Sequence, residues 1–249
     1  LGDEIMFASM IPDLLLSSSK LIVHVDERLI PLFRRSFSDD IDFRSKAEAI
    51  SEHEFDTHIP IGSLPHYFRQ NIEKFETSSR GWLTANNVKT GHLREKLIED
   101  GSETIIGISW HSTKPRRGAA AKVISLAQMA ERLHGPKIKL VNLQYGDVRE
   151  ELADLKKNMG IEVLQLPEID ITNNIDGLAA LIMACDRVVS ISNLTIHLAG
   201  ALGKEAHVLL ASSSDWRWGY KRDKTYWYGS VHLHRQTNFN DWETVLKQL

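Results

Sequence analysis

The second half of the chain alternates short apolar runs with stretches whose apolar residues recur at helical spacing. From Ile105 onward the runs read IIGISW, IKLVNL, IEVLQL, RVVSI and AHVLL. The stretches between them predict helices over residues 119–133, 148–158, 175–185 and 195–202. Near-continuous apolar strands need helices on both faces of their sheet. This half is therefore predicted to be a doubly wound parallel sheet, which a strand SVHLHR and a short helix from Asp241 complete.

The first hundred residues show a weaker form of the same alternation. Helices are predicted over residues 3–16, despite Pro12, and over residues 28–37, with a strand KLIVHV between them. Residues 70–90 mix Ser, Asn, Gly and Trp without periodicity, so no element is predicted there. The fold class is therefore α/β in both halves.

The length of 249 residues allows either one large α/β unit or two units of roughly 100 to 150 residues. The acidic, glycine-containing segment LIEDGSE indicates a linker near Gly101. We therefore expect an N-terminal unit of residues 1–103 and a C-terminal unit of residues 104–249.

Composition is ordinary for a globular protein, with 42% hydrophobic and 25% charged residues. The formal net charge of -3 argues against a polyanion-binding domain, so no nucleic-acid partner is expected. No apolar run reaches about 18 residues, and the start LGDEIMFASM lacks the basic region of a signal peptide, so we expect no integral membrane segment and a cytoplasmic location. Because Leu1 is not an initiator methionine, a longer parent protein is expected. The lone Cys185 is expected to be buried and inert.

A polar turn between a strand and a helix is the strongest candidate site, in the sequence RVVSISNLTIHLAGALGK. Ligands of open α/β sheets gather at the carboxyl ends of strands, and a helix N-terminus there offers free N–H groups to a diphosphate. Ser192 and Asn193 would cap the helix or bind phosphate directly, and backbone N–H groups near Asn193 and Leu194 would donate to the diphosphate. Thr195 is a further candidate for contact with the substrate. The alternative is a plain helix cap. His197 lies either beside the phosphates or sugar, or buried against the backbone.

Two further loops follow strands at the same edge. The loop WHSTKPRRG carries Lys114, Arg116 and Arg117, which would neutralise a leaving diphosphate or form a solvated basic turn. Gln144, in the loop after IKLVNL, would face a base or ribose.

Aromatic and basic residues interleave between Ser212 and Ser230. Trp216 and Arg222 would stack on or bind a nucleobase or sugar, or this long loop packs on itself. At the opposite end of the chain, Asp3 either favours a helix dipole or, facing a cleft between the units, accepts a proton from an attacking hydroxyl.

Several motifs are absent from the sequence. It has no Gly-x-x-x-x-Gly-Lys-Ser/Thr, no Gly-x-Gly-x-x-Gly after a strand, no His-Glu-x-x-His and no cysteine cluster. Kinase-like NTPases, nicotinamide enzymes and zinc hydrolases therefore lose support, and no metal or cofactor is expected.

Five segments resemble the ADP-heptose:lipopolysaccharide heptosyltransferase family (glycosyltransferase family nine) and, more closely, related domains that follow tetratricopeptide repeats in bacterial proteins. They are LGDEIMFASMIPDL, GISWHST, VNLQYG, VVSISNLTIHLAGALGK and SSDWRWGYKRDKTYWYGSVHLHRQ. The resemblance implies a glycosyltransferase B fold: two Rossmann-like domains, with the donor nucleotide on the C-terminal one, the acceptor on the N-terminal one and no metal. The family's first strand would precede Leu1 and is missing here.

The resemblance also implies roles. The family's Gly-Asp pair falls on Gly2 and Asp3, which makes Asp3 the candidate base. Its cationic loop falls near Lys114. Its Ser-Val-Asp-Thr loop reads Ser-Ile-Ser-Asn here, ending in Ser192 and Asn193, so a carboxylate is lost.

Three functions follow as hypotheses. The first is an inverting, metal-independent hexosyl- or heptosyltransferase that moves a sugar from a nucleotide-diphosphate sugar to a hydroxyl of a glycan, a lipid-linked glycan or a protein. The second, favoured by the lost carboxylate, is an inactive nucleotide- or sugar-binding scaffold module of a tetratricopeptide-repeat protein. A nucleotide-sugar epimerase would need a carboxylate and histidine set that the sequence does not reveal.

Overall fold

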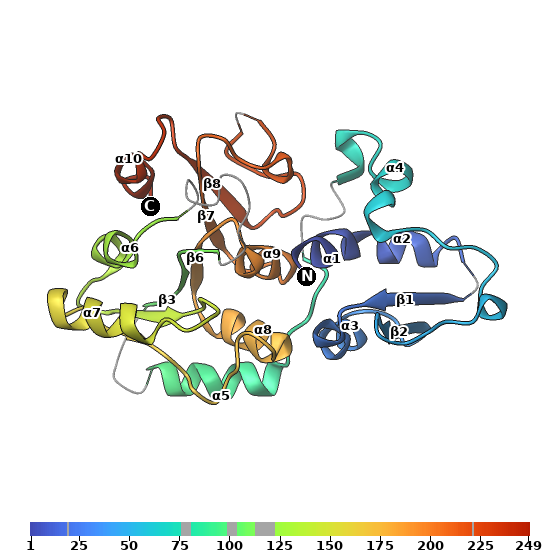
Figure 1. Cartoon of the computed structure of the whole chain (residues 1–249), viewed down its shortest axis with the longest axis horizontal. Coiled ribbons are helices and arrows are strands. Elements are labelled where there is room, and N and C mark those ends of the chain that lie inside the picture. The colour runs from blue at the N-terminus through green and yellow to red at the C-terminus, as the bar shows by residue number, and fades with distance from the viewer. Residues whose placement is uncertain (19, 76–80, 99–103, 113–122, 221) are drawn as a thin grey trace.

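Two parallel sheets form the framework of the protein (Figure 1). The computed structural model describes residues 1–18, 20–75, 81–98, 104–112, 123–220 and 222–249. The larger sheet has the strand order β5-β4-β3-β6-β7-β8 and the smaller one the order β1-β2, and every pairing between these strands is parallel. The α/β class with mainly parallel sheets is therefore confirmed.

The order in which the chain adds strands to the large sheet reverses at the centre of the sheet. Its strands are β3 (Thr104–Ser109), β4 (Ile138–Asn142), β5 (Val163–Leu164), β6 (Arg187–Ile191), β7 (Ala206–Leu210) and β8 (Val231–Arg235). The chain runs outward from β3 to β5, then returns to β6 beside β3 and runs outward the other way. The carboxyl ends of β3 and β6 therefore form the topological switch point, where doubly wound sheets bind their ligands.

Helices cover both faces of the large sheet, as near-continuous apolar strands require. They are α5 (Asn87–Ile98), α6 (Leu126–Leu133), α7 (Arg149–Met159), α8 (Ile175–Ala184), α9 (Leu194–Ala201) and α10 (Trp242–Leu246). Neighbouring strand residues enter different cores. Val188 packs in one buried cluster with residues of α8 and α9, whereas Val189 packs in another with residues of α6 and α10. The predicted doubly wound arrangement is confirmed.

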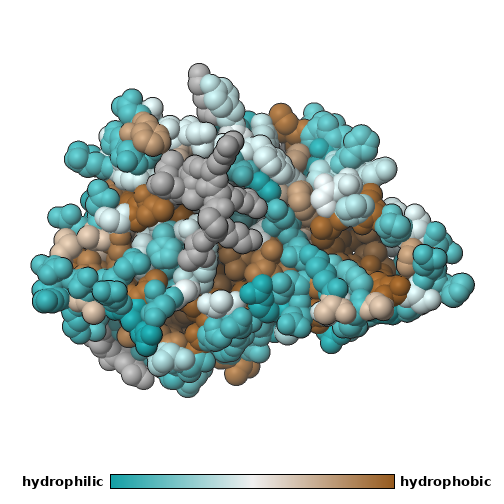
Figure 2. Space-filling view, in the orientation of Figure 1, coloured by the Kyte–Doolittle hydropathy of each residue, from teal (hydrophilic) through white to brown (hydrophobic). Residues whose placement is uncertain are grey.

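The N-terminal half places short helices around the small sheet. Its elements are α1 (Gly2–Phe7), η1 (Ala8–Met10), α2 (Ile11–Leu15), β1 (Leu21–Val25), η2 (Glu27–Leu29), α3 (Ile30–Ser36), β2 (Ile41–Ser45), η3 (Glu52–Glu54), η4 (Ile61–Ser63) and α4 (Pro65–Phe68). The single helix predicted over residues 3–16 is wrong. A 3₁₀ turn interrupts it, and Pro12 lies in the first turn of α2, where its missing N–H costs nothing. Figure 2 shows apolar side chains bordering a hollow in this half.

Other elements also differ from the sequence predictions. Helix α6 begins after Ser125, whose Oγ accepts from Gln128 N at 3.2 Å, so residues 123–125 are not helical, and residues 119–122 lie outside the described chain. Only Val163 and Leu164 of the run IEVLQL form a strand. Helix α5 was not predicted.

Backbone hydrogen bonds, an ion pair and helix packing join the two halves. Trp82 N and Leu83 N both donate to Ala201 O, at 2.8 and 2.9 Å, beside the end of α9. Arg35 of α3 pairs with Asp176 of α8. Helix α5 packs along α8. The expected boundary near Gly101 falls outside the described residues, and no helix within the described ranges is long and apolar enough to cross a membrane.

Candidate functional site at the junction of the two halves

The switch point brings the ends of β3 and β6 together. Ser109 of β3 is the register partner of Ser190 of β6. Asn193, which follows β6, donates from Nδ2 to Ser109 Oγ at 2.7 Å. The two strand-end loops lie at one edge of the sheet, as predicted, and the order of the strands brings them into contact.

Side chains at the start of α9 are used inside the protein. Asn193 Oδ1 accepts from Thr195 N at 3.0 Å and from Ser190 Oγ at 3.1 Å, so its amide caps the helix. Thr195 is fully buried, and its hydroxyl donates to Leu143 O at 3.2 Å. In this structure the Asn193 side chain therefore caps α9. Because it is buried, the Thr195 side chain does not reach a ligand in this structure. The backbone N–H groups near Leu194 are the remaining candidates for binding phosphate at the start of α9.

Gln144 is also turned inward. It is fully buried, and its Oε1 accepts from Ser109 Oγ at 2.9 Å and from the backbone N–H groups of Trp110 and His111 at 3.0 Å each. The expected contact of this side chain with a base or ribose does not fit this burial. Instead, Gln144 fixes the loop that leaves β3.

His197 lies in a cage of aromatic side chains. Its ring stacks on Trp218 with centroids 5.2 Å apart and planes at 22°, and its Nδ1 lies 2.7 Å from the hydroxyl of Tyr228. Trp218 in turn donates from Nε1 to Ser192 Oγ at 2.8 Å. The histidine is buried, as in one of the two alternatives, but the hydrogen-bond partner of its Nδ1 is the phenol of Tyr228 and not the backbone. Burial, reinforced by the nearby positive charge of Arg217, lowers the pKa of His197 to about 4.

Asp3 meets the C-terminal half at Arg217. Arg217 lies in η7 (Trp216–Trp218), and its Nε and Nη2 contact Asp3 Oδ1 at 2.9 and 2.6 Å. The same guanidinium holds Asp215 Oδ1 through Nη1 at 2.6 Å. The Asp3 side chain is 55% exposed, whereas that of Arg217 is 16% exposed. Residues 214 positions apart thus form one polar corner, which we call the junction corner: Asp3, His197, Asp215 and Arg217.

Close contact between α1 and α9 builds the junction corner. A Cβ placed on Gly2 would lie 3.1 Å from His197 Cδ2 and 3.7 Å from His197 Nε2, so a larger residue at Gly2 would crowd the imidazole. Because α1 starts on that ring, Asp3 extends from its first turn toward Arg217. Within the described residues, no group of three or more His, Cys, Asp or Glu side chains could hold a metal ion.

The remaining candidates are less closely tied to the junction corner. Trp216 is 62% exposed, with the Arg217 guanidinium 4.7 Å from its ring centroid. Arg222 lies over Tyr226, 4.1 Å from the ring centroid, and donates to its hydroxyl at 2.7 Å. Lys114 and Arg116 lie outside the described residues.

The sequence placed Arg217, Trp218 and Tyr228 in the aromatic and basic segment between Ser212 and Ser230 but did not single out any of the three. The available signal was the run Asp-Trp-Arg-Trp, in which an arginine follows a carboxylate by two positions and stands between two indoles. That spacing lets Asp215 cap the turn and hold the guanidinium at once.

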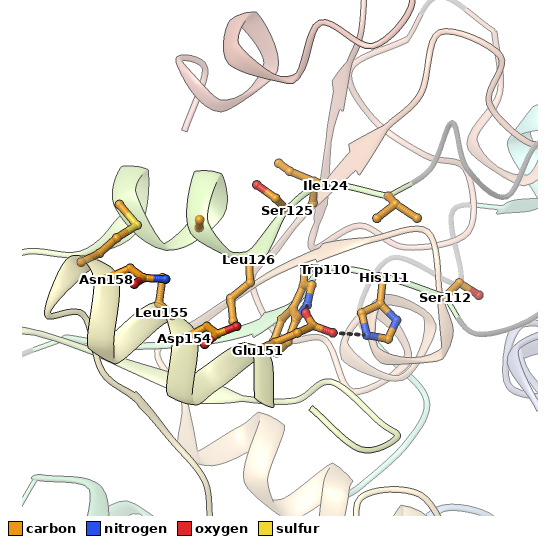
Figure 3. Close-up of a pocket in the computed structure, with 13 residues that line it drawn as sticks. Trp110, His111, Ser112, Ile124, Ser125, Leu126, Glu151, Asp154, Leu155 and Asn158 are labelled. Carbon is orange, nitrogen blue, oxygen red and sulfur yellow. Dashed lines mark hydrogen bonds and ion pairs between the residues drawn. The ribbon is translucent and has the colours of Figure 1, made fainter. Parts of the chain in front are cut away.

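A hollow of about 500 Å³ lies between the end of β3, α6 and α7 (Figure 3). Trp110 stands in its wall and donates from Nε1 to Glu151 Oε2 at 2.6 Å, and Glu151 Oε1 lies 3.6 Å from His111 Nε2. Leu126 and Leu155 line its apolar side. The hollow adjoins the loop that leaves β3 at the switch point.

The depressed pKa of His197 predicts an acid-sensitive fold. As the pH falls below 6.5, the unfolded chain binds a proton on this histidine, whereas the folded chain does so only near pH 4. The free energy of unfolding should therefore fall by about 3 kcal/mol across this window, at roughly 1.4 kcal/mol per unit of pKa difference. Urea denaturation at pH 7 and pH 4.5 measures this loss, and His197→Gln should remove it. Equal pH slopes in the two proteins would contradict the assignment.

Comparison with known proteins identifies a relative in sequence and solved structures with a similar fold. No family model matches the chain. Protein FlbA of Caulobacter vibrioides is 32% identical over 261 aligned residues, which cover 99% of this chain and 43% of FlbA. The chain thus spans less than half the length of that relative.

Two solved structures share the architecture. E. coli ADP-heptose LPS heptosyltransferase II aligns with a TM-score of 0.62 at 12% identity, over 99% of this chain and 94% of that chain. The glycosyl transferase family 9 protein of Veillonella parvula DSM 2008 aligns with a TM-score of 0.61 at 13% identity, over 94% and 83%. At such identities the likeness establishes the fold, which is that of glycosyltransferase family 9 structures.

Proposed function

We propose that this chain is a glycosyltransferase module that moves a sugar from a nucleotide-diphosphate sugar to an acceptor hydroxyl, with inversion and without a metal. One observation carries the proposal: Asp3, from the N-terminal half, lies half exposed against Arg217 of the C-terminal half. A base supplied by one half and a donor site supplied by the other suit a reaction between two separately bound substrates. The two solved structures compared above are named as a glycosyl transferase and a heptosyltransferase.

The chemistry follows from the corner. The contacts from Arg217 fall on Asp3 Oδ1, so Oδ2 is the oxygen that would take the proton of the acceptor hydroxyl. The acceptor oxygen then bonds to the anomeric carbon from the face opposite the leaving group, and the bond from that carbon to the diphosphate oxygen breaks. Backbone N–H groups at the start of α9, near Leu194, would stabilise the departing diphosphate together with the loop of Lys114 and Arg116.

We further propose the two-domain organisation of a glycosyltransferase B fold, with units of residues 1–103 and 104–249. Two separate parallel sheets support it. Helix α5 belongs to the first unit by this boundary, yet it packs on α8 of the second and so ties the units together.

Donor binding tests the proposal. Calorimetric titration of the protein with UDP-, GDP- and ADP-linked sugars should detect binding of at least one of them. Leu194→Pro is the diagnostic variant, because proline is tolerated at the first position of a helix but removes the N–H assigned to the diphosphate. We expect it to weaken binding about tenfold, the equivalent of roughly 1.4 kcal/mol for one charge-assisted hydrogen bond. Leu194→Ala loses the side chain but keeps the N–H, and it should bind nearly as well as the wild type.

A non-catalytic scaffold module is the second candidate, and a specific observation favours it. The side chains of Ser192 and Asn193 are both engaged within the protein, by Trp218 and by Ser109. A titration in which none of the nucleotide sugars binds would support the scaffold and contradict the transferase.

A further inference from the structure

Tyr228 and His197 form a buried pair behind the junction corner. Tyr228 is 1% exposed and His197 6% exposed, and the phenol oxygen lies 2.7 Å from His197 Nδ1. Tyr228 comes from the loop before β8, whereas His197 is in the middle of α9. The contact therefore fixes two elements that meet only in the folded protein.

Both rings pack closely against their neighbours. A Cβ on Gly200 would lie 2.5 Å from two ring carbons of Tyr228, so the tyrosine ring is seated on the bare backbone of α9. Trp82 stacks on the tyrosine ring at 5.5 Å and 16°. Trp218 stacks on the imidazole in the same manner. The imidazole itself is held between Trp218, Tyr228 and the backbone of Gly2, and these contacts set which of its nitrogens meets the phenol.

The hydrogen bond has two possible directions. The phenol O–H donates to a bare Nδ1, or a protonated Nδ1 donates to the phenol oxygen. Among the described residues, His197 is the hydrogen-bond partner recorded for the Tyr228 hydroxyl. In the second arrangement the buried O–H would therefore lack an acceptor, which is unfavourable for a buried polar group. Burial also keeps the phenol protonated, because it raises the pKa of Tyr228 well above its ordinary value. The first arrangement is favoured, and a neutral imidazole then carries its proton on Nε2.

The Nε2 edge of the ring faces the junction. A Cβ on Gly2 would lie 3.7 Å from Nε2, so this nitrogen lies against the start of α1, next to Asp3. We infer that Tyr228 is a positioning residue: it holds His197 as the Nε2–H tautomer and so presents one N–H donor, between α1 and α9, to an oxygen of the sugar donor. The ligand part of this inference rests on the proposed function, whereas the tautomer part does not.

Nitrogen-15 NMR of the ring nitrogens tests the tautomer directly. In the wild-type protein we expect a protonated Nε2 and a bare Nδ1 on His197. Tyr228→Phe keeps the ring packing and removes only the hydroxyl, so His197 should become a mixture of tautomers while the remaining backbone spectrum is retained. Tyr67→Phe, at an exposed tyrosine of α4, should leave His197 unchanged. A wild-type Nδ1–H tautomer, or an unchanged tautomer in Tyr228→Phe, overturns the inference.

Binding of the donor supplies the second readout. Tyr228→Phe should weaken the affinity for the nucleotide sugar that binds best by about fivefold to tenfold, a factor typical of one hydrogen bond. In a His197→Gln background the same substitution should have no further effect, because the group that Tyr228 positions is gone. Equal losses in both backgrounds would overturn the positioning role. If no nucleotide sugar binds while the Nε2–H signal is present, the proposed function fails and the tautomer assignment stands.

Discussion

Replacing Asp3 by Asn is expected to reduce sugar transfer by at least about 100-fold, the lower end of what a positioned general base contributes. Asparagine keeps the shape of the side chain and an oxygen that can accept from Arg217, so the contact between the halves is retained. It cannot take the proton of an attacking hydroxyl. The affinity for the nucleotide sugar should stay nearly the same, because the donor is assigned to the C-terminal half.

The measurement is a transfer assay with the donor that binds best, together with a titration of the same variant. Asp147→Asn is the matched control, since Asp147 is also an exposed carboxylate paired with an arginine, Arg149, at 2.7 Å. It should transfer at the wild-type rate. Full activity in Asp3→Asn would remove Asp3 as the base.

Replacing Gly81 by Ala is expected to destabilise the fold by about 3 kcal/mol or more, because two costs add. Gly81 has a φ of 78°, a conformation that costs a side-chain-bearing residue about 1–2 kcal/mol. Its Cβ would also lie 2.6 Å from Gly203 N and 2.9 Å from Leu202 C. These are backbone atoms that cannot rotate away, and overpacking of this kind costs about 1–3 kcal/mol. The following hydrogen bonds from Trp82 and Leu83 to Ala201 would be strained as well.

Substitutions at two other glycines distinguish the cost of the positive φ from the cost of the steric clash. Gly160 has a φ of 68° with nothing within 4 Å of an added Cβ, so Gly160→Ala should cost only about 1–2 kcal/mol. Gly91 lies inside α5 with equally open space, and Gly91→Ala should stabilise by up to about 1 kcal/mol. Urea denaturation of the three variants gives the order. A Gly81→Ala protein no less stable than Gly160→Ala would refute the close approach between Gly81 and the end of α9.

Local pattern was sufficient for most of the C-terminal half. The strands β3, β4, β6 and β7 are rich in apolar, mostly β-branched or leucine residues, and β8 alternates apolar with polar residues. The helices between them have apolar residues at helical spacing. These periodicities are properties of neighbouring residues, so they are legible in the sequence. Helix α5 was missed because only Leu93 and Leu97 of its twelve residues are buried. Its stability comes from packing on α8, which no local window contains.

From the sequence alone, the loops after β3 and β6 could be placed on the same edge of the sheet, because the carboxyl ends of parallel strands share one edge. That these two loops touch follows from the strand order, which makes β3 and β6 neighbours. It did not determine which way their side chains turn. Gln144 and Thr195 are polar residues in rim positions, yet both are fully buried, since the backbone groups around them need partners.

The junction corner exists only in the folded chain. Asp3 and Arg217 are 214 residues apart, and nothing in the sequence around either residue predicts that the two form an ion pair. The position proposed for Tyr228 depends in the same way on contacts distant in sequence: its ring packs on Gly200, and its hydroxyl hydrogen-bonds to His197. Secondary structure follows from interactions a few residues apart, whereas a site between two halves depends on how their surfaces fit, and that fit is a property of the whole folded chain.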